Sequence, residues 1–187
     1  MKYKLFNKLL FTVILLLLVY GCVEEEITEP TDENLLLNTS FEKDGKFSIT
    51  GWSLPALYDT SNDVPPNGGN FSLELQANAP PEDYAFIKVP VKTQYTINQL
   101  SFWAKSTGIS SSIYGKAILS QVRNGSQIKS STIVIDGVDG IVWTSYSIRD
   151  TFNVAAGDSF MVQFSAGINQ LFSSETYFDL CQLQGIK

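Results

Sequence analysis

The chain has 187 residues, a length typical of one domain with or without a tail. Its 13 basic and 19 acidic residues give a net charge of −6, so the basic surface of a nucleic-acid-binding protein is missing. It contains no histidine, which excludes Ser-His-Asp and Cys-His catalysis and histidine-ligated metal sites. Two cysteines, Cys22 and Cys181, are too few for a four-cysteine metal cluster or a disulfide framework.

The first 21 residues have the composition of an export signal. Lys2, Lys4 and Lys8 make a positive start, and the apolar run Leu9–Tyr20 follows. This run of about 12 residues is shorter than the roughly 20 that a helix needs to cross a bilayer. A positive start, a short apolar run and a small residue at the end predict a secretory signal peptide over 1–21.

A cysteine follows the predicted signal directly. Val19-Tyr20-Gly21-Cys22 resembles a bacterial lipobox, in which the signal is cut before a cysteine that is then lipidated. Tyr20 departs from the small residue usual at its position. The resemblance implies a lipoprotein held by acyl chains on Cys22 at a bacterial membrane, at the outer membrane and cell surface. A plain secreted protein with a chance cysteine is the alternative.

An acidic stretch separates Cys22 from the rest of the chain. Residues 23–33 contain six acidic residues and no basic one, so the segment 22–33 is expected to stay solvated as a tether. It also resembles the surface-export signals of some Gram-negative lipoproteins, and both interpretations stay open. From Asn34 onward, ten basic and 13 acidic residues leave a charge of only −3, which suits neutral ligands better than polyanions.

The residues 34–187 are predicted to form one all-β domain. Apolar residues alternate with period two, and we find no amphipathic helix of three turns. The alternation places three trios in the core: Phe71, Leu73 and Leu75; Leu100, Phe102 and Ala104; and Phe160, Val162 and Phe164. Five further strands are expected at Tyr84–Val89, Lys116–Arg123, Gln127–Ile135, Thr144–Ile148 and Thr176–Leu183. Asn124-Gly125 predicts a two-residue hairpin turn, and many short strands between such turns predict a two-sheet β-sandwich or jelly roll.

A family resemblance runs through this domain in a fixed order. The segments that carry it are Asn34–Glu42 followed by Gly51-Trp52, Asn67–Leu75, Leu100–Lys105, the surroundings of Trp143, Ala156-Gly157-Asp158 and Tyr177–Leu180. Together they resemble carbohydrate-binding modules of the galactose-binding-like superfamily over about 34–187. The resemblance implies a jelly-roll sandwich of a five-stranded and a four-stranded sheet. The superfamily holds sugar binders and also domains whose ligand is unknown.

The resemblance also implies a structural calcium ion where the first and last strands meet. Glu42 and Asp179 would be its carboxylate ligands, and backbone carbonyls of Asn67–Asn70 would add oxygens, as calcium requires. The alternative is an exposed Glu42 and an edge-strand Asp179 without a metal. We reject the interpretation of these two acids as a glycosidase pair, because acids on adjoining terminal strands usually lie away from an open sugar cleft.

Strand parity selects the candidate sugar site. If Phe102 and Ala104 face the core, Trp103 and Lys105 face away from it, and an indole outside the core offers a flat surface for a sugar ring. Gln121 and Arg123 are candidates to flank the indole, and Tyr58 and Tyr84 are looser candidates beside loops. A loop at 55–66 that covers Trp103 is the alternative. The remaining tryptophans, Trp52 and Trp143, occupy positions that the family uses for packing, and Cys181 is expected in the core.

The leading hypothesis is a non-catalytic, surface-anchored lipoprotein that binds a neutral polysaccharide or oligosaccharide. Its motivation is the lipobox, the acidic tether, the family resemblance and the predicted outward indole of Trp103. The alternative is a structural or adaptor domain that holds a protein partner through an edge strand or exposed patch. Hydrolase activity is disfavoured, because a nucleophilic serine has no histidine and no Ser-x-x-Lys lysine to activate it.

Overall fold

A computed structural model describes residues 33–76, 84–107, 115–135, 141–167 and 175–186. The predicted signal peptide 1–21 and the tether up to residue 32, with Cys22, lie outside this part of the chain. Among the described residues, no helix is long and apolar enough to span a membrane.

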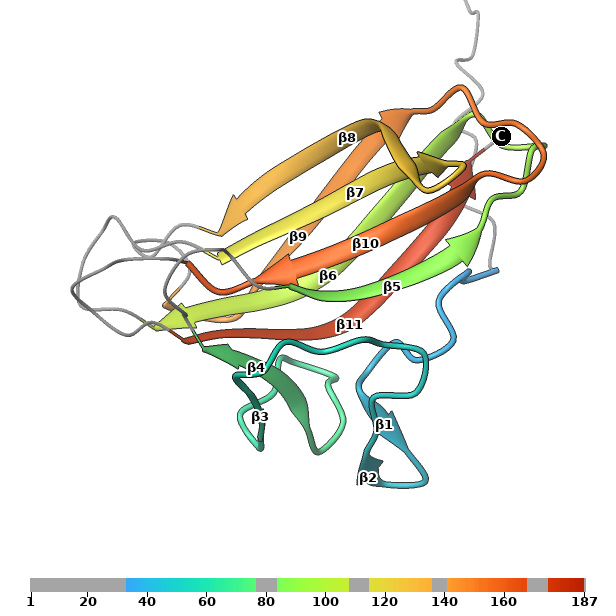
Figure 1. Ribbon diagram of the computed structural model, residues 1–187. Coiled ribbons are helices and arrows are strands. Elements are labelled where there is room, and N and C mark those ends of the chain that lie inside the picture. Colours follow the sequence, from blue (N-terminus) through green and yellow to red (C-terminus); the bar gives the residue numbers. More distant parts are fainter. Residues whose placement is uncertain (1–32, 77–83, 108–114, 136–140, 168–174, 187) are drawn as a thin grey trace, which may run out of the picture.

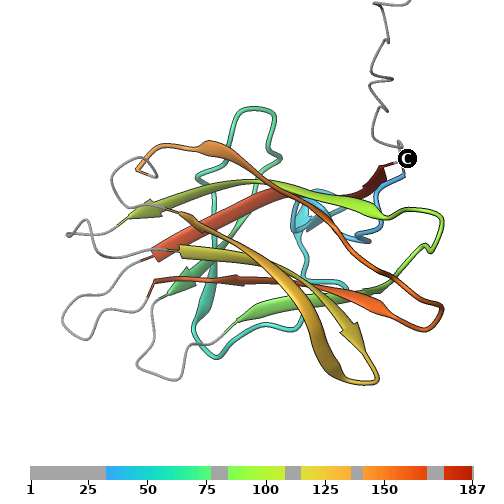
Figure 2. The same ribbon diagram turned by 90° about the horizontal axis from the view of Figure 1, so that it is seen from above.

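The domain is a sandwich of two antiparallel sheets (Figures 1 and 2). The five-stranded sheet has the order β3 (Tyr58–Ser61), β4 (Ser72–Gln76), β11 (Glu175–Ile186), β6 (Ile97–Thr107) and β9 (Thr144–Thr151). The four-stranded sheet has the order β5 (Ala85–Pro90), β10 (Ser159–Ser165), β7 (Gly115–Arg123) and β8 (Ser126–Ile135). A short hairpin, β1 (Glu42–Lys43) and β2 (Lys46–Phe47), lies beside them. The predicted all-β jelly-roll sandwich is confirmed.

The core lies between the two sheets and is rich in phenylalanine. Phe178 of β11 stacks on Phe164 of β10 with ring centroids 4.4 Å apart, and Phe102 of β6 contacts both rings. Each of these side chains is at most 1% exposed. Trp52 stacks on Phe164 and donates its indole N–H to the carbonyl of Asn38 at 3.1 Å, so its predicted packing role is confirmed.

The period-two alternation assigns the inward faces correctly on β6 and β10. Leu100, Phe102 and Ala104 are buried, as are Phe160, Val162 and Phe164. Cys181 is fully buried, as predicted, and burial raises the pKa of its thiol. The Asn124-Gly125 turn joins β7 to β8 with both residues at positive φ (50° and 81°), as a type I′ turn requires.

Three features of the fold differ from the prediction. Phe71 precedes β4 and packs edge-on against Phe47, so only Leu73 and Leu75 of its trio are buried. The strand β3 replaces part of the loop expected at 55–66, and the β1–β2 hairpin was not predicted. Both elements are very short and largely polar, so their sequence has no apolar alternation to reveal them.

Candidate functional site

Trp103 lies on the outer face of the five-stranded sheet. Along β6, buried and partly exposed residues alternate without interruption, so Phe102 and Ala104 face the core and Trp103 and Lys105 face outward. The outer faces of the neighbouring strands continue this surface, because residues directly opposite in an antiparallel pair share a face. Trp103 is opposite Asp179 of β11 and Ser145 of β9.

Next to Trp103, hydroxyl and amide side chains form what we call the polar strip. Ser101 is opposite Gln182 of β11 and Ser147 of β9, and Gln99 is opposite Gln184 one step further along. These residues are partly or fully exposed. The polar strip therefore consists of Gln99, Ser101, Ser145, Ser147, Gln182 and Gln184, which cross three adjacent strands. These six side chains carry no charge and all offer hydrogen bonds. The exposed Arg149 of β9, opposite Gln99, adds one positive charge at the end of the strip.

A pocket of about 290 Å³ opens where the polar strip meets the indole. We call it the Trp103 pocket; Asn67, Ser101, Trp103, Ser145, Leu180 and Gln182 line it. Its volume is at the small end of the range of ligand sites, about 300–1,000 Å³. One aromatic surface with several uncharged polar groups around it is an arrangement that matches a small, neutral, polyhydroxylated ligand.

A β-bulge in β11 shapes this pocket. The register with β6 shifts between Asp179 and Gln182, and Leu180 in the bulge has a positive φ of 49°. The amide of Leu180 donates to Asp179 Oδ1 at 2.7 Å, and the amide of Cys181 donates to the Thr39 carbonyl at 2.6 Å. The bulge thereby places Leu180 in the pocket wall, which is a common use of bulges beside functional sites.

The segment 62–71, here called the wall loop, closes one side of the pocket and is fastened at Asp63. The Asp63 carboxylate accepts the indole N–H of Trp143 at 2.8 Å and pairs with the Lys105 ammonium. That ammonium also lies 4.9 Å from the centroid of the Tyr177 ring. The hydrogen bond from Lys105 holds the pKa of Asp63 below its ordinary value. Lys105 thus lies beside Trp103 on the same face, but its ammonium is paired with Asp63 of the wall loop.

Trp143 corrects one prediction. It is not a core residue: it is half-buried on the outer face, edge-on to Tyr177 at 6.4 Å between ring centroids. Trp143 directly precedes β9, two residues before Ser145, which is opposite the outward Trp103, and the exposed Ile141 and Val142 lie beside it.

Asp179 is buried beneath the wall loop without a full set of partners. Its side chain is fully buried, and Oδ2 accepts no hydrogen bond from the described residues. Burial raises the pKa of Asp179 to about 7, and the nearby charge of Glu42 adds to the rise despite the hydrogen bond from the Leu180 amide. A buried carboxylate oxygen that lacks a donor costs free energy unless a proton or a cation satisfies it.

The backbone of the wall loop lies close to both acids. A Cβ on Gly68 would be 2.8 Å from Asp179 Oδ2 and 2.9 Å from the Pro65 carbonyl oxygen, so both oxygens border one small space. The Glu42 carboxylate is held against the loop by the amides of Phe71, at 2.5 Å, and Asn70. Two carboxylates and a backbone carbonyl converging on a glycine turn are the hard oxygen donors that calcium prefers.

The side chains at this position supply too few ligands to hold a metal ion by themselves. Among the described residues, no three acidic or cysteine side chains gather closely enough to form a metal site from side chains alone. Calcium takes six to eight oxygens, so backbone carbonyls and water would supply most of the shell here. With that provision, the residues Glu42, Asp179 and Pro65 fit the predicted ion.

Gln121 and Arg123 do not flank Trp103, because β7 belongs to the four-stranded sheet. Both side chains bind Asp158: Arg123 donates to both carboxylate oxygens at 2.8 Å, and Gln121 donates to Oδ2 at 2.7 Å. Arg123 is the main cause of a pKa of Asp158 well below its ordinary value. These residues form a network that closes the turn at 155–158, where the Ala155 amide also donates to Asp158.

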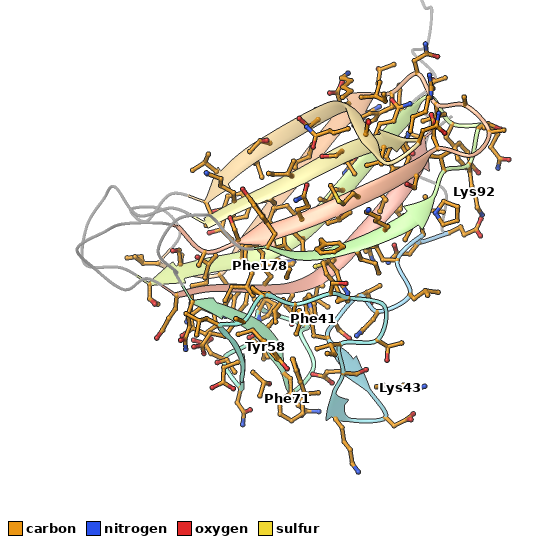
Figure 3. The ribbon with its side chains drawn as sticks, viewed as in Figure 1. Phe41, Lys43, Tyr58, Phe71, Lys92 and Phe178 are labelled. Atoms are coloured by element: carbon orange, nitrogen blue, oxygen red, sulfur yellow. The ribbon has the colours of Figure 1, made fainter. Side chains whose placement is uncertain are left out.

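The two tyrosine candidates also lie apart from the Trp103 pocket. Tyr58 begins β3 at the edge of the five-stranded sheet (Figure 3). It is opposite the core residue Leu75, so it does not share the outer face. Tyr84 precedes β5 of the other sheet. Of the predicted sugar-site residues, the structure therefore groups Trp103 and Lys105.

Two parts of the site were missed at the sequence level. Gln182 and Gln184 alternate with the buried Leu183, a period-two signal that would have placed both glutamines on the outer face. Asn67 had no such signal as a pocket residue, because its place over Trp103 depends on how the wall loop folds back across the sheet. Its positive φ of 65° is consistent with the turn-forming sequence around it.

No known family profile matches the chain, and no curated protein matches its sequence. Solved structures are similar in fold. The enzymatically active domain of tailspike protein 4 from bacteriophage CBA120 matches with a TM-score of 0.61 and 17% identity, over 82% of this chain and 21% of that chain. This chain therefore spans about a fifth of the tailspike chain.

Two carbohydrate-binding modules match over nearly their whole length. TmCBM61, solved in complex with beta-1,4-galactotriose, has a TM-score of 0.53 at 16% identity, over 81% of this chain and 98% of that chain. The CBM22-1 xylan-binding domain of Paenibacillus barcinonensis Xyn10C has a TM-score of 0.55 at 15% identity, with 85% and 98% covered. At such identities the likeness establishes the fold: the chain has the β-sandwich fold of carbohydrate-binding modules.

Proposed function

We propose that the protein binds a neutral glycan in the Trp103 pocket and along the polar strip, without catalysing a reaction. The observation that carries the proposal is the half-buried indole of Trp103, outside the core and in a pocket lined by uncharged polar groups. Sugar rings present flat C–H surfaces to an aromatic face and hydroxyls to amides. The similarity in fold to modules described as bound to galactotriose or as xylan-binding supports the same class of ligand.

The charges around the pocket favour a neutral ligand over an acidic one. The residues that line the pocket carry no charge. Lys105 is the cationic side chain nearest to Trp103 on β6, and Asp63 already neutralises it. The exposed Arg149 is on the same outer face, but it lies opposite Gln99, four residues along β6 from Trp103. A uronic acid or sulfate in the pocket would therefore lose water without a cation in the lining to pair with, so acidic glycans should bind more weakly there.

Calcium belongs to this proposal as a structural ion. Glu42 and Asp179 would hold it with the Pro65 carbonyl, and the ion would fix the wall loop to β11. The same geometry argues against a glycosidase pair, since the wall loop covers Asp179 completely. The protein would be presented at a bacterial outer membrane through lipid on Cys22 and the acidic tether that follows; these two features are proposed from sequence alone.

Replacement of Trp103 by alanine should abolish most of the affinity for the glycan. Truncation of a central aromatic anchor typically costs about 2 kcal/mol or more of binding free energy, which corresponds to a roughly 30-fold higher dissociation constant. The measurement is isothermal titration of the purified protein and of Trp103→Ala with β-1,4-galactotriose, soluble xylan and the hits of a glycan array.

Thr132→Ala is the matched control for this experiment. Thr132 is exposed on β8 of the other sheet, and its loss should leave the affinity unchanged. Equal binding by the wild type and Trp103→Ala would place the glycan elsewhere. An absence of binding to every neutral glycan on the array would count against the proposed function as a whole.

A further inference from the structure

We propose that calcium at Glu42 and Asp179 controls the shape of the Trp103 pocket, so that the cation and the glycan bind cooperatively. The glycan half of this inference rests on the proposed function, and the calcium half rests on the geometry around Asp179. Neither the fold nor a structural role for calcium requires such a link, because an ion that only braced the sandwich would leave the ligand pocket unchanged.

The first connection runs through β11. Asp179 is fully buried toward the cation site, whereas Leu180, the next residue, lines the Trp103 pocket. The two are tied further by the hydrogen bond from the Leu180 amide to Asp179 Oδ1 at 2.7 Å. In the register of the sheet, Asp179 is the residue directly opposite Trp103. A shift of the Asp179 carboxylate toward a cation would therefore act on two sides of the pocket.

The second connection runs through the wall loop. Asn67 lines the Trp103 pocket, while Gly68 directly beside it lies against Asp179 Oδ2, and Gly69 lies against the Glu42 carboxylate. Three consecutive residues therefore face three different groups: Asn67 faces the ligand pocket, Gly68 faces Asp179, and Gly69 faces Glu42. A cation that drew the two carboxylates and the Pro65 carbonyl together would move Asn67 with them.

The far attachment of the wall loop does not depend on the cation. Asp63 is bound to Trp143 and Lys105, and the Ser72 hydroxyl donates to the Asp63 carbonyl at 2.7 Å. With that end fixed, a change at Glu42 and Asp179 is confined to the stretch between Asp63 and Phe71, which contains Asn67. The structure therefore couples the two sites through one short segment and one bulge.

Coupling between two binding sites is reciprocal and typically corresponds to a 5- to 150-fold change in affinity. We expect calcium to tighten glycan binding about tenfold, and the glycan to tighten calcium binding by the same factor. A test needs a signal from the pocket itself that does not require a glycan. Trp103 supplies it, because the protein has only two other tryptophans, Trp52 in the core and Trp143 on the wall-loop fastening.

The experiment is a calcium chloride titration of the full chain labelled with 5-fluorotryptophan, observed by ¹⁹F NMR and by calorimetry. Substitution of each tryptophan by phenylalanine assigns the three resonances. We expect the Trp103 resonance to shift with the midpoint of the calorimetric isotherm, while Trp52 stays in place. Asp179→Asn should remove both the heat and the shift, and Glu175→Gln, a carboxylate change elsewhere on β11, should preserve both.

Each result decides the question. Calcium binding without movement of the Trp103 resonance would overturn the coupling and leave a purely structural ion. An absence of calcium binding would overturn it as well. The glycan proposal would then be tested separately, by the glycan titrations of the wild type and Trp103→Ala. In the glycan arm, β-1,4-galactotriose or xylan that binds equally in calcium and in EDTA contradicts the coupling but supports the proposed function. Affinity about tenfold higher in calcium supports both.

Discussion

Without calcium, the protein is expected to lose stability as the pH rises from about 4 to about 7. Asp179 has its pKa raised from 3.8 to about 7 in the folded state, mainly by burial. Between these values the folded chain keeps a proton that the unfolded chain has released, so rising pH favours unfolding. A rise of this size corresponds to about 4 kcal/mol, present below pH 4 and lost above pH 7.

Calcium is expected to reverse this loss at neutral pH and to do little near pH 4. The cation binds the ionised carboxylate, so it replaces the proton only where the proton has left. The measurement is urea unfolding at pH 4.5, 6 and 8, each in EDTA and in millimolar calcium. Asp179→Asn should flatten the profile in EDTA and remove the calcium effect, because the neutral amide needs no counter-ion. Identical pH profiles for the wild type and Asp179→Asn would refute this account of the buried acid.

Phe178→Ala should be among the most destabilising single substitutions in the domain. Phe178, labelled in Figure 3, is fully buried on β11. It is stacked on Phe164 at 4.4 Å between ring centroids and lies close to Phe102. Removal of a buried phenylalanine side chain costs about 3–5 kcal/mol through lost burial and the cavity left behind. Urea unfolding of the wild type and Phe178→Ala measures this loss directly.

Tyr58→Ala serves as the comparison for that core substitution. Tyr58 is an aromatic residue of the same sheet, but it is 43% exposed at the edge strand β3. Its replacement should change the free energy of unfolding by roughly 0.5 kcal/mol or less. Similar losses for the two variants would mean that the stacked phenylalanines are not the main support of the sandwich.

The sheet architecture was largely predictable because the central strands alternate cleanly. Burial of every second residue in β6 and β10 follows from the pleat of a strand with one face on the core, and this period is visible in the sequence. The same parity predicts from the sequence alone that Trp103 lies outside the core. It worked because β6 has no bulge that would change the face of a residue partway along the strand.

The composition of the site was harder to predict because it depends on which strands are neighbours. Gln121 and Arg123 are polar, but β7 lies in the opposite sheet, and sequence alternation says nothing about sheet membership. Gln121 is also buried, opposite the core residue Phe160, because its partner Asp158 reaches it through a long-range contact. The bulge at Asp179–Gln182 and the path of the wall loop are likewise products of long-range contacts. They bring Asn67, Leu180 and Gln182 to the indole although these residues are distant along the chain.

The central claim is that a glycan binds on the outer face of the five-stranded sheet. Its most direct test is a ¹⁵N–¹H NMR titration of the protein with the glycan that binds most tightly on the array. We predict the largest changes at the Trp103 indole N–H, the Gln182 side-chain amide and the Ser101 and Ser145 backbone amides. Changes confined to the outer face of the four-stranded sheet, around Met161 and Ser130, with an unmoved Trp103 indole, would contradict the claim.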